Sequence, residues 1–166
     1  GGILNYCYEL SGNREFLDGA QRQNAVLRDR LYNHPETLDH DIGFLYAPTI
    51  FAEYKITGNK ECLNTARDAA DILIKRYNAK GKFIQAWDEW PFEKDFSKNN
   101  PRRMIIDCMF NLPLLFEISK ETGDDKYAVV AESHADTCSR TIVREDGTTF
   151  HTYLYNPETG EPDRGE

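Results

Sequence analysis

Apolar residues recur along this chain at helical spacing, in segments that alternate between strongly and moderately apolar. Residues 43–54 and 104–119 are rich in large apolar side chains, a pattern typical of helices enclosed on most sides. In the segments that follow them, apolar residues fall only at every third or fourth position, which predicts helices with one solvated face. The expected fold is therefore a series of helix pairs, each with an inner and an outer member.

A phrase that occurs three times marks the turns between these helices. It is SGNRE at residues 11–15, TGNKE at residues 57–61 and TGDDK at residues 122–126. The glycine ends one helix, and the polar residue after it caps the next. The repeat predicts an all-α fold, an array of about three α/α hairpins.

Short extended segments follow two of the outer helices. Residues 79–84 and 145–150 share a glycine turn before an apolar residue, and residues 151–155 are expected to form a small strand. The NPETG sequence at residues 156–160 ends that strand. Such loops project from one end of a helical array, where functional sites are usually built.

The composition of the chain excludes several classes of function. The chain has 166 residues, enough for one domain, and its 28 acidic residues against 20 Lys and Arg give a formal charge of −8. This balance argues against nucleic-acid binding, which needs a basic face. No apolar run approaches the roughly 20 residues that span a bilayer, so a membrane partner is not expected. The first residues lack the basic and apolar regions of a signal peptide, so a cytoplasmic location is expected.

The remaining motifs give no indication of a metal or cofactor. Cys7, Cys62, Cys108 and Cys138 form no Cys-x-x-Cys pair, so free thiols are expected, most of them among apolar residues. Neither a glycine-rich phosphate loop nor a Gly-x-Ser-x-Gly elbow occurs.

Asp107 is the most informative candidate for chemistry. It is the only carboxylate within residues 104–116, and its apolar neighbours predict desolvation, which raises a carboxyl pKa toward the range of a general acid. Asn111, one helical turn later, is predicted to hydrogen-bond it. The alternative is that Asp107 caps the helix or pairs with Arg102 or Arg103.

A second group of acids lies immediately before an inner helix. Asp39 and Asp41 flank His40, and taken alone both are best explained as residues that cap the helix. Neighbouring side chains point in different directions, so the His40–Asp41 pair does not by itself indicate a catalytic arrangement.

Aromatic and histidine residues provide further candidates. Residues 85–90, QAWDEW, place Trp87 and Trp90 on a predicted loop, where an aromatic face could stack on a sugar ring or simply pack under the loop. His151, on the expected strand, could line the same end or be an ordinary strand residue. His134, on an apolar helix face, is expected to be a hydrogen-bonded core residue.

Together these residues resemble the unsaturated glucuronyl hydrolases of glycoside hydrolase family 88. The resemblance is carried by residues 38–44, 81–87, 103–115, 134–137 and 149–153, which run in order across nearly the whole chain. The family forms a toroid of six α/α hairpins about twice this length. The resemblance therefore implies that the chain is part of a catalytic barrel that continues at both ends.

The resemblance also implies a reaction and a set of roles. Family members add water across the C4=C5 vinyl ether of an unsaturated uronic acid at the end of an oligosaccharide, which then releases the remaining sugar. Asp107 matches the catalytic acid/base, and Asp41 matches a second essential aspartate that holds the sugar hydroxyls. His40, Trp87 and His151 match positions that bind the substrate. No metal or cofactor is implied, and the oligomeric state is left open.

Two alternatives remain at this stage. Unsaturated rhamnogalacturonyl hydrolases share the barrel and the vinyl-ether chemistry, although residues 40–44 are more similar to the glucuronyl enzymes. A helical-repeat module that binds a glycan or a protein partner without catalysis would also explain the hairpins. Such a module would not require an acid at Asp107.

Overall fold

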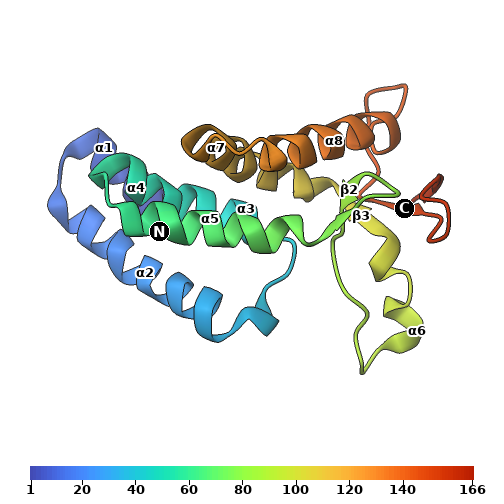
Figure 1. The fold of residues 1–166 in the computed structure, drawn as a ribbon, viewed down its shortest axis with the longest axis horizontal. Helices are drawn as coiled ribbons and strands as arrows, with labels where there is room; N and C mark the ends of the chain where they lie inside the picture. Colours follow the sequence, from blue (N-terminus) through green and yellow to red (C-terminus); the bar gives the residue numbers. More distant parts are fainter.

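The computed structural model describes residues 1–166, apart from the side chain of residue 96. The helices pack as three consecutive hairpins in the described chain (Figure 1). The first members of the pairs are α1 (Gly2–Ser11), the continuous run of α3 (Ile42–Tyr46), η2 (Ala47–Phe51) and α4 (Ala52–Thr57), and α7 (Leu112–Thr122). The second members are α2 (Arg14–Asn33), α5 (Lys60–Ile74) and α8 (Lys126–Thr141). The predicted array of α/α hairpins is confirmed.

The repeated phrase turns the chain within each hairpin, as predicted. Its glycines adopt the left-handed conformation, with φ of 67°, 71° and 72° at Gly12, Gly58 and Gly123. Such φ values carry little penalty only for glycine. The next residue then caps the following helix: the Asn59 Oδ1 atom accepts a hydrogen bond of 3.0 Å from the Glu61 N–H, and Asn13 does the same for α2.

Both of the predicted enclosed helices differ from the expectation. The helix expected at residues 43–54 contains a π-helical segment around Pro48, which cannot donate a backbone hydrogen bond. The helix expected at residues 104–119 begins only at Leu112; the preceding residues form strand β3 (Arg103–Ile105) and the 3-10 segment η4 (Ile106–Asn111). The reason is tertiary, because β3 pairs with strand β4 (Thr152–Tyr155).

Short strands gather at one end of the hairpins (Figure 1). Strands β1 (Tyr77–Asn78) and β2 (Phe83–Ile84) form a small hairpin. Strands β3, β4 and β5 (Pro162–Gly165) form an antiparallel sheet in that order. The expected strand at residues 151–155 is confirmed from residue 152 onward. The connections include two 3-10 turns and one short helix: η1 (Pro35–Thr37), η3 (Asn100–Arg102) and α6 (Lys94–Ser97).

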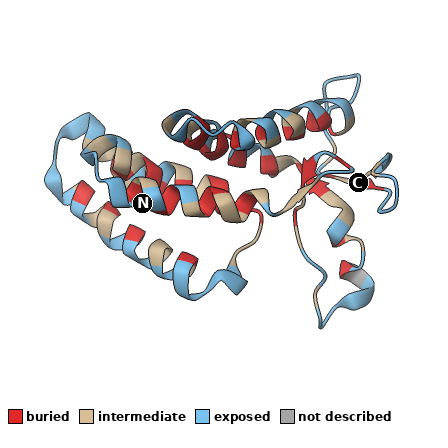
Figure 2. Ribbon diagram, viewed as in Figure 1, coloured by how far each residue is buried: buried red, intermediate tan, exposed pale blue. Residues whose placement is uncertain are grey.

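The main hydrophobic core lies between the second and third hairpins, where buried residues line the facing sides of their helices (Figure 2). A second cluster joins α8 to the strands, with the ring of Phe83 stacked on Tyr155 at 4.4 Å between centroids. All four cysteines are free thiols in the described chain, and Cys62, Cys108 and Cys138 are buried. Within the part of the chain that the structure describes, none of the helices combines the length and apolarity needed to cross a membrane.

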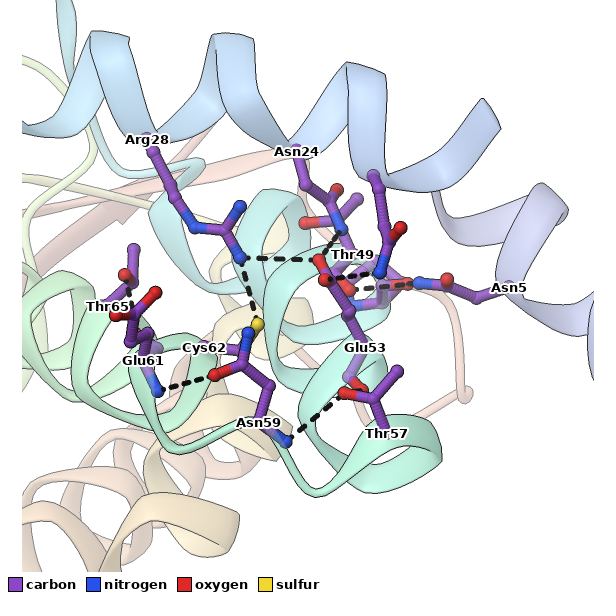
Figure 3. Close-up of polar contacts among 12 residues, drawn as sticks. Asn5, Asn24, Arg28, Thr49, Glu53, Thr57, Asn59, Glu61, Cys62 and Thr65 are labelled. Atoms are coloured by element: carbon purple, nitrogen blue, oxygen red, sulfur yellow. Dashed lines mark hydrogen bonds and ion pairs between the residues drawn. The ribbon is translucent and has the colours of Figure 1, made fainter. Parts of the chain in front are cut away.

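A buried carboxylate joins the first hairpin to the second (Figure 3). Glu53 of α4 is 3% exposed and accepts hydrogen bonds from Asn24 Nδ2 at 2.8 Å, Gln21 Nε2 at 3.1 Å and Arg28 Nη2 at 3.3 Å, all on α2. These partners compensate for the loss of water around the charge. They also explain why Asn24 interrupts the apolar face of α2.

Candidate active site

Two carboxylates and one imidazole meet at the end of the hairpins that carries the strands. His40 and Asp41 immediately precede α3, and Asp107 lies in the first turn of η4. The Nε2 atom of His40 is 3.1 Å from Asp41 Oδ1 and 3.3 Å from Asp107 Oδ1. The structure therefore brings together three residues that the sequence analysis selected from two distant segments.

A glycine and an asparagine hold these two segments together. The N–H of Gly43 donates a hydrogen bond of 2.7 Å to Oδ1 of Asn111, which is fully buried. A Cβ atom at Gly43 would lie only 2.3 Å from the Asn111 Cα, so a larger residue cannot approach this closely. The prediction that Asn111 bonds to Asp107 is wrong, because η4 is not α-helical and the amide reaches across to α3 instead.

Asp107 occupies a more open position than its apolar neighbours predicted. Its side chain is 40% exposed although its Oδ1 atom is buried, so the expected desolvation holds for only one of the two carboxylate oxygens. The explanation in terms of arginine pairing is wrong as well. Arg102 contacts Asp163 at 2.9 Å, and Arg103 contacts Glu166 at 2.9 Å. Nor does Asp107 cap a helix, since neither η4 nor α7 has a side-chain cap bond from it.

The carboxyl with a raised pKa in this site is Asp41. Partial burial is the main cause, the nearby negative charges of Asp39 and Asp107 add to it, and the charge of His40 opposes it. Asp41 stands at the N-cap position of α3, but its side chain makes no cap hydrogen bond there. The capping explanation is therefore wrong for Asp41. Asp39 instead accepts a hydrogen bond of 2.9 Å from the Asp41 N–H.

His40 is enclosed beside an aromatic ring. It is 3% exposed, and its ring meets Trp87 edge to face at 5.4 Å between centroids. Trp87 is half-buried and packs against Ala86, Ile105 and Cys108. It therefore packs under the loop and at the same time lies against the imidazole that contacts both carboxylates.

The other candidate residues, Trp90, His151 and His134, make contacts outside this group of three. Trp90 stacks on Phe92 with ring centroids 6.3 Å apart. His151 is exposed and precedes β4 by one residue; its carbonyl accepts a hydrogen bond of 3.0 Å from the Ile106 N–H, next to Asp107. The described contacts pair its ring with neither carboxylate. His134 is buried and accepts a hydrogen bond from the backbone, which confirms it as a core residue.

The site contains two overlapping groups of atoms that could ligate a metal. The ligand atoms of Asp39, His40 and Asp41 lie within 4.8 Å of one another, and so do those of His40, Asp107 and Cys108, but the second group is a poor donor set. Burial raises the pKa of the Cys108 thiol, and its Sγ atom lies 3.8 Å from the Ile84 carbonyl oxygen. A metal requires the thiolate, which this environment disfavours.

The geometry suits acid–base chemistry on a sugar. Two carboxylates share one imidazole, and Asp41 is the more enclosed of the two side chains. Asp107 is partly exposed, and His40 contacts both Asp107 and the ring of Trp87, so a ligand that stacks on this ring lies close to the carboxyl. Strand β4 and the segments that precede α3 and follow β2 meet at this site, so it depends on contacts distant in the sequence.

Known proteins are similar to this chain in sequence and in fold. The profile of Glycosyl Hydrolase Family 88 matches residues 1–165. An unsaturated chondroitin disaccharide hydrolase of Streptococcus pneumoniae is 43% identical over 99% of this chain and 40% of its own length. The crystal structure of an unsaturated glucuronyl hydrolase of Streptococcus agalactiae matches with a TM-score of 0.89 and 39% identity, over 99% of this chain and 40% of that one.

A second solved structure agrees with the first. It is an unsaturated glucuronyl hydrolase of Bacillus sp. GL1, described as responsible for the degradation of glycosaminoglycan. It matches with a TM-score of 0.89 and 40% identity, over 99% of this chain and 42% of that chain. The chain thus spans about 40% of the length of the curated relatives that it matches. The chain belongs to glycosyl hydrolase family 88.

Proposed function

We propose that the protein is an unsaturated glucuronyl hydrolase and that residues 1–166 form part of its α/α-barrel catalytic domain. The observation that carries this proposal is the convergence of Asp41 and Asp107 on His40, beside Trp87, in a chain of family 88. The substrate is an oligosaccharide with a 4,5-unsaturated uronic acid at its non-reducing end, such as lyases produce from glycosaminoglycans.

The reaction is a hydration followed by rearrangement. A proton is added to C4, positive charge develops at C5 and the ring oxygen, and the oxygen of a water molecule bonds to C5 as this water gives up a proton to a carboxylate. The bond between C5 and the ring oxygen of the resulting hemiketal then breaks; the C5 hydroxyl loses its proton and the ring oxygen gains one, which leaves a ketone at C5 and a hemiacetal at C1. The bond between C1 and the glycosidic oxygen breaks last: the C1 hydroxyl loses its proton to give an aldehyde, and the released sugar takes up a proton on its oxygen. Ordinary glycosidases instead break the anomeric bond directly between two carboxyl groups.

The open side of Asp107 suits it to deliver the proton. A carboxyl that must reach C4 needs an unobstructed approach, and 40% of this side chain is exposed. A sugar ring placed over it also excludes water from the reacting atoms. Asp41 holds the sugar hydroxyls, and the imidazole of His40 lies between the two carboxylates.

Trp87 and His151 complete the described part of the substrate site. The half-buried indole offers a face for the sugar, and His151 lies at the exposed edge near Ile106. Cytoplasmic location is part of the same proposal; its support is the presence of four free cysteines, as in proteins from reducing compartments.

Absorbance spectroscopy tests the function directly. Turnover of an unsaturated disaccharide by the full-length protein removes the conjugated C4=C5 bond and its ultraviolet absorbance. Asp107→Asn is expected to lower kcat about 1,000-fold, in the range typical of loss of a general acid. Asp68→Asn, at a surface acid of α5, is the matched control. Wild-type turnover by Asp107→Asn would contradict the mechanism, and comparison of glycosaminoglycan-derived with pectin-derived disaccharides identifies the substrate class.

A further inference from the structure

Residues 85–88, which carry Trp87, form no helix or strand, and the side chain of Arg76 makes three contacts with them. Arg76 donates from Nε to the Gln85 carbonyl at 3.1 Å and from Nη2 to the Ala86 carbonyl at 3.1 Å. Its Nη1 atom contacts Asp88 Oδ2 at 3.0 Å. The guanidinium group therefore holds the loop on both sides of Trp87.

The position of Arg76 suits this arrangement. It follows the C-terminus of α5, and its own carbonyl accepts a hydrogen bond of 2.9 Å from the Gln85 N–H. Its side chain is 13% exposed, so water has little access to the guanidinium group, whereas the Asp88 side chain that it contacts is 71% exposed. The two backbone carbonyls are therefore the more important partners. The planar guanidinium directs several donors at fixed angles, which the single ammonium group of a lysine cannot do.

Gln85 extends the contact to the tryptophan itself. Its Nε2 atom donates to the Trp87 carbonyl at 2.8 Å and to Asp88 Oδ1 at 2.9 Å. Asn100 donates to the Asp88 carbonyl at 3.2 Å from the opposite side. The whole network ends at the backbone of Trp87, whose ring lies against His40.

We propose that Arg76 is a positioning residue for substrate binding, which rests on the function proposed above. It holds residues 85–88 so that the indole of Trp87 stays edge-on to His40 and ready to stack on the sugar. Arg76 acts through the loop; its contacts in the described chain are with the backbone and with Asp88. Loss of the guanidinium group is therefore expected to weaken substrate binding more than the chemical step.

Kinetics of the full-length protein test this proposal. Arg76→Ala is expected to raise KM for an unsaturated disaccharide about tenfold, the effect of losing about 1.4 kcal/mol of binding, with a much smaller change in kcat. Added guanidinium is expected to restore KM toward wild type, whereas ammonium is not. Arg67→Ala, on exposed α5 surface, is the matched control and leaves KM unchanged.

A double-mutant cycle separates positioning from general destabilisation. If Arg76 acts through Trp87, Arg76→Ala causes no further rise in KM in a Trp87→Ala background. An equal rise in both backgrounds, or an unchanged KM in the single variant, overturns the proposal.

Amide hydrogen exchange gives a readout that needs no substrate. Faster exchange at the Gln85 and Ala86 N–H groups is expected in Arg76→Lys, with unchanged exchange in α8. Unchanged exchange at the loop would overturn the proposal even in an inactive protein. Absence of turnover by the wild-type protein would instead count against the proposed function alone.

Discussion

His134 makes the stability of this protein depend on pH. It lies on α8, is fully buried, and its Nδ1 atom accepts a hydrogen bond of 2.9 Å from the Ile84 N–H. Burial lowers its pKa to about 4. The imidazole therefore stays neutral in the folded protein at pH values where an unfolded chain protonates it.

The sign and size of the effect follow from the two pKa values. Between the unfolded value near 6.5 and the folded value of about 4, the unfolded state binds more protons, so stability rises with pH. The contribution is complete above about pH 6.5 and is lost progressively as the pH falls toward 4. At about 1.4 kcal/mol for each pKa unit, the full effect is about 3 kcal/mol.

Urea unfolding at pH 7 and pH 5 measures this contribution. The variant His134→Asn removes the titrating group, and its side-chain oxygen can still accept from the Ile84 N–H. The wild-type protein is expected to lose about 2 kcal/mol more unfolding free energy than this variant between the two pH values. His34→Asn, at an exposed histidine, is the control and should behave as wild type. Identical pH dependence in wild type and His134→Asn would refute the reasoning.

Two further substitutions test the contacts that shape the fold and the site. Gly43→Ala places a Cβ atom 2.3 Å from the Asn111 Cα and so pushes apart the segments that carry Asp41 and Asp107. The kcat is therefore expected to fall about 100-fold. A wild-type kcat would contradict this. Glu53→Ala leaves Asn24 and Arg28 without their buried partner and is expected to lower the unfolding free energy by about 3 kcal/mol in a urea titration. The control is Arg14, which forms an exposed ion pair with Asp18; Arg14→Ala should lower the unfolding free energy by less than about 1 kcal/mol. An equal loss in both variants would show that burial of Glu53 does not matter.

The hairpins could be predicted from the sequence because their signals are local. A glycine that must adopt positive φ, a polar cap after it and apolar residues at helical spacing all lie within one or two turns of chain. The three glycine phrases therefore indicated the three hairpin turns correctly. The same local information was sufficient to identify His134 as a core residue, since it falls on the apolar face of α8.

The start of the third inner helix could not be predicted in this way. Residues 104–116 contain apolar residues at a density that suits an enclosed helix, but Met104 pairs with Tyr153 and Ile105 with Thr152 in the sheet. These partners lie more than 45 residues away in the sequence, and helical spacing carries no information about them. The predicted bond between Asp107 and Asn111 depended on the helix and was therefore wrong, and the Asp107 side chain is only partly buried.

The residues that hold the site together are harder to recognise from the sequence. Gly43 at the start of an inner helix could have indicated close approach of another segment, although nothing nearby identifies Asn111 as its partner. Arg76 follows an outer helix as an ordinary basic residue, and the acceptors of its guanidinium group are mostly backbone carbonyls. Backbone acceptors are present at every position, so the sequence cannot distinguish them.

The position of Asp107 shows why apolar neighbours do not by themselves predict an enclosed carboxyl. In the 3-10 turn, Cys108 is buried beneath Asp107, while Phe110 is 68% exposed. The apolar residues around the acid thus face several directions and do not form a shell around it. Under the proposed function this open side is what a general acid requires, because the sugar must be able to reach the carboxyl.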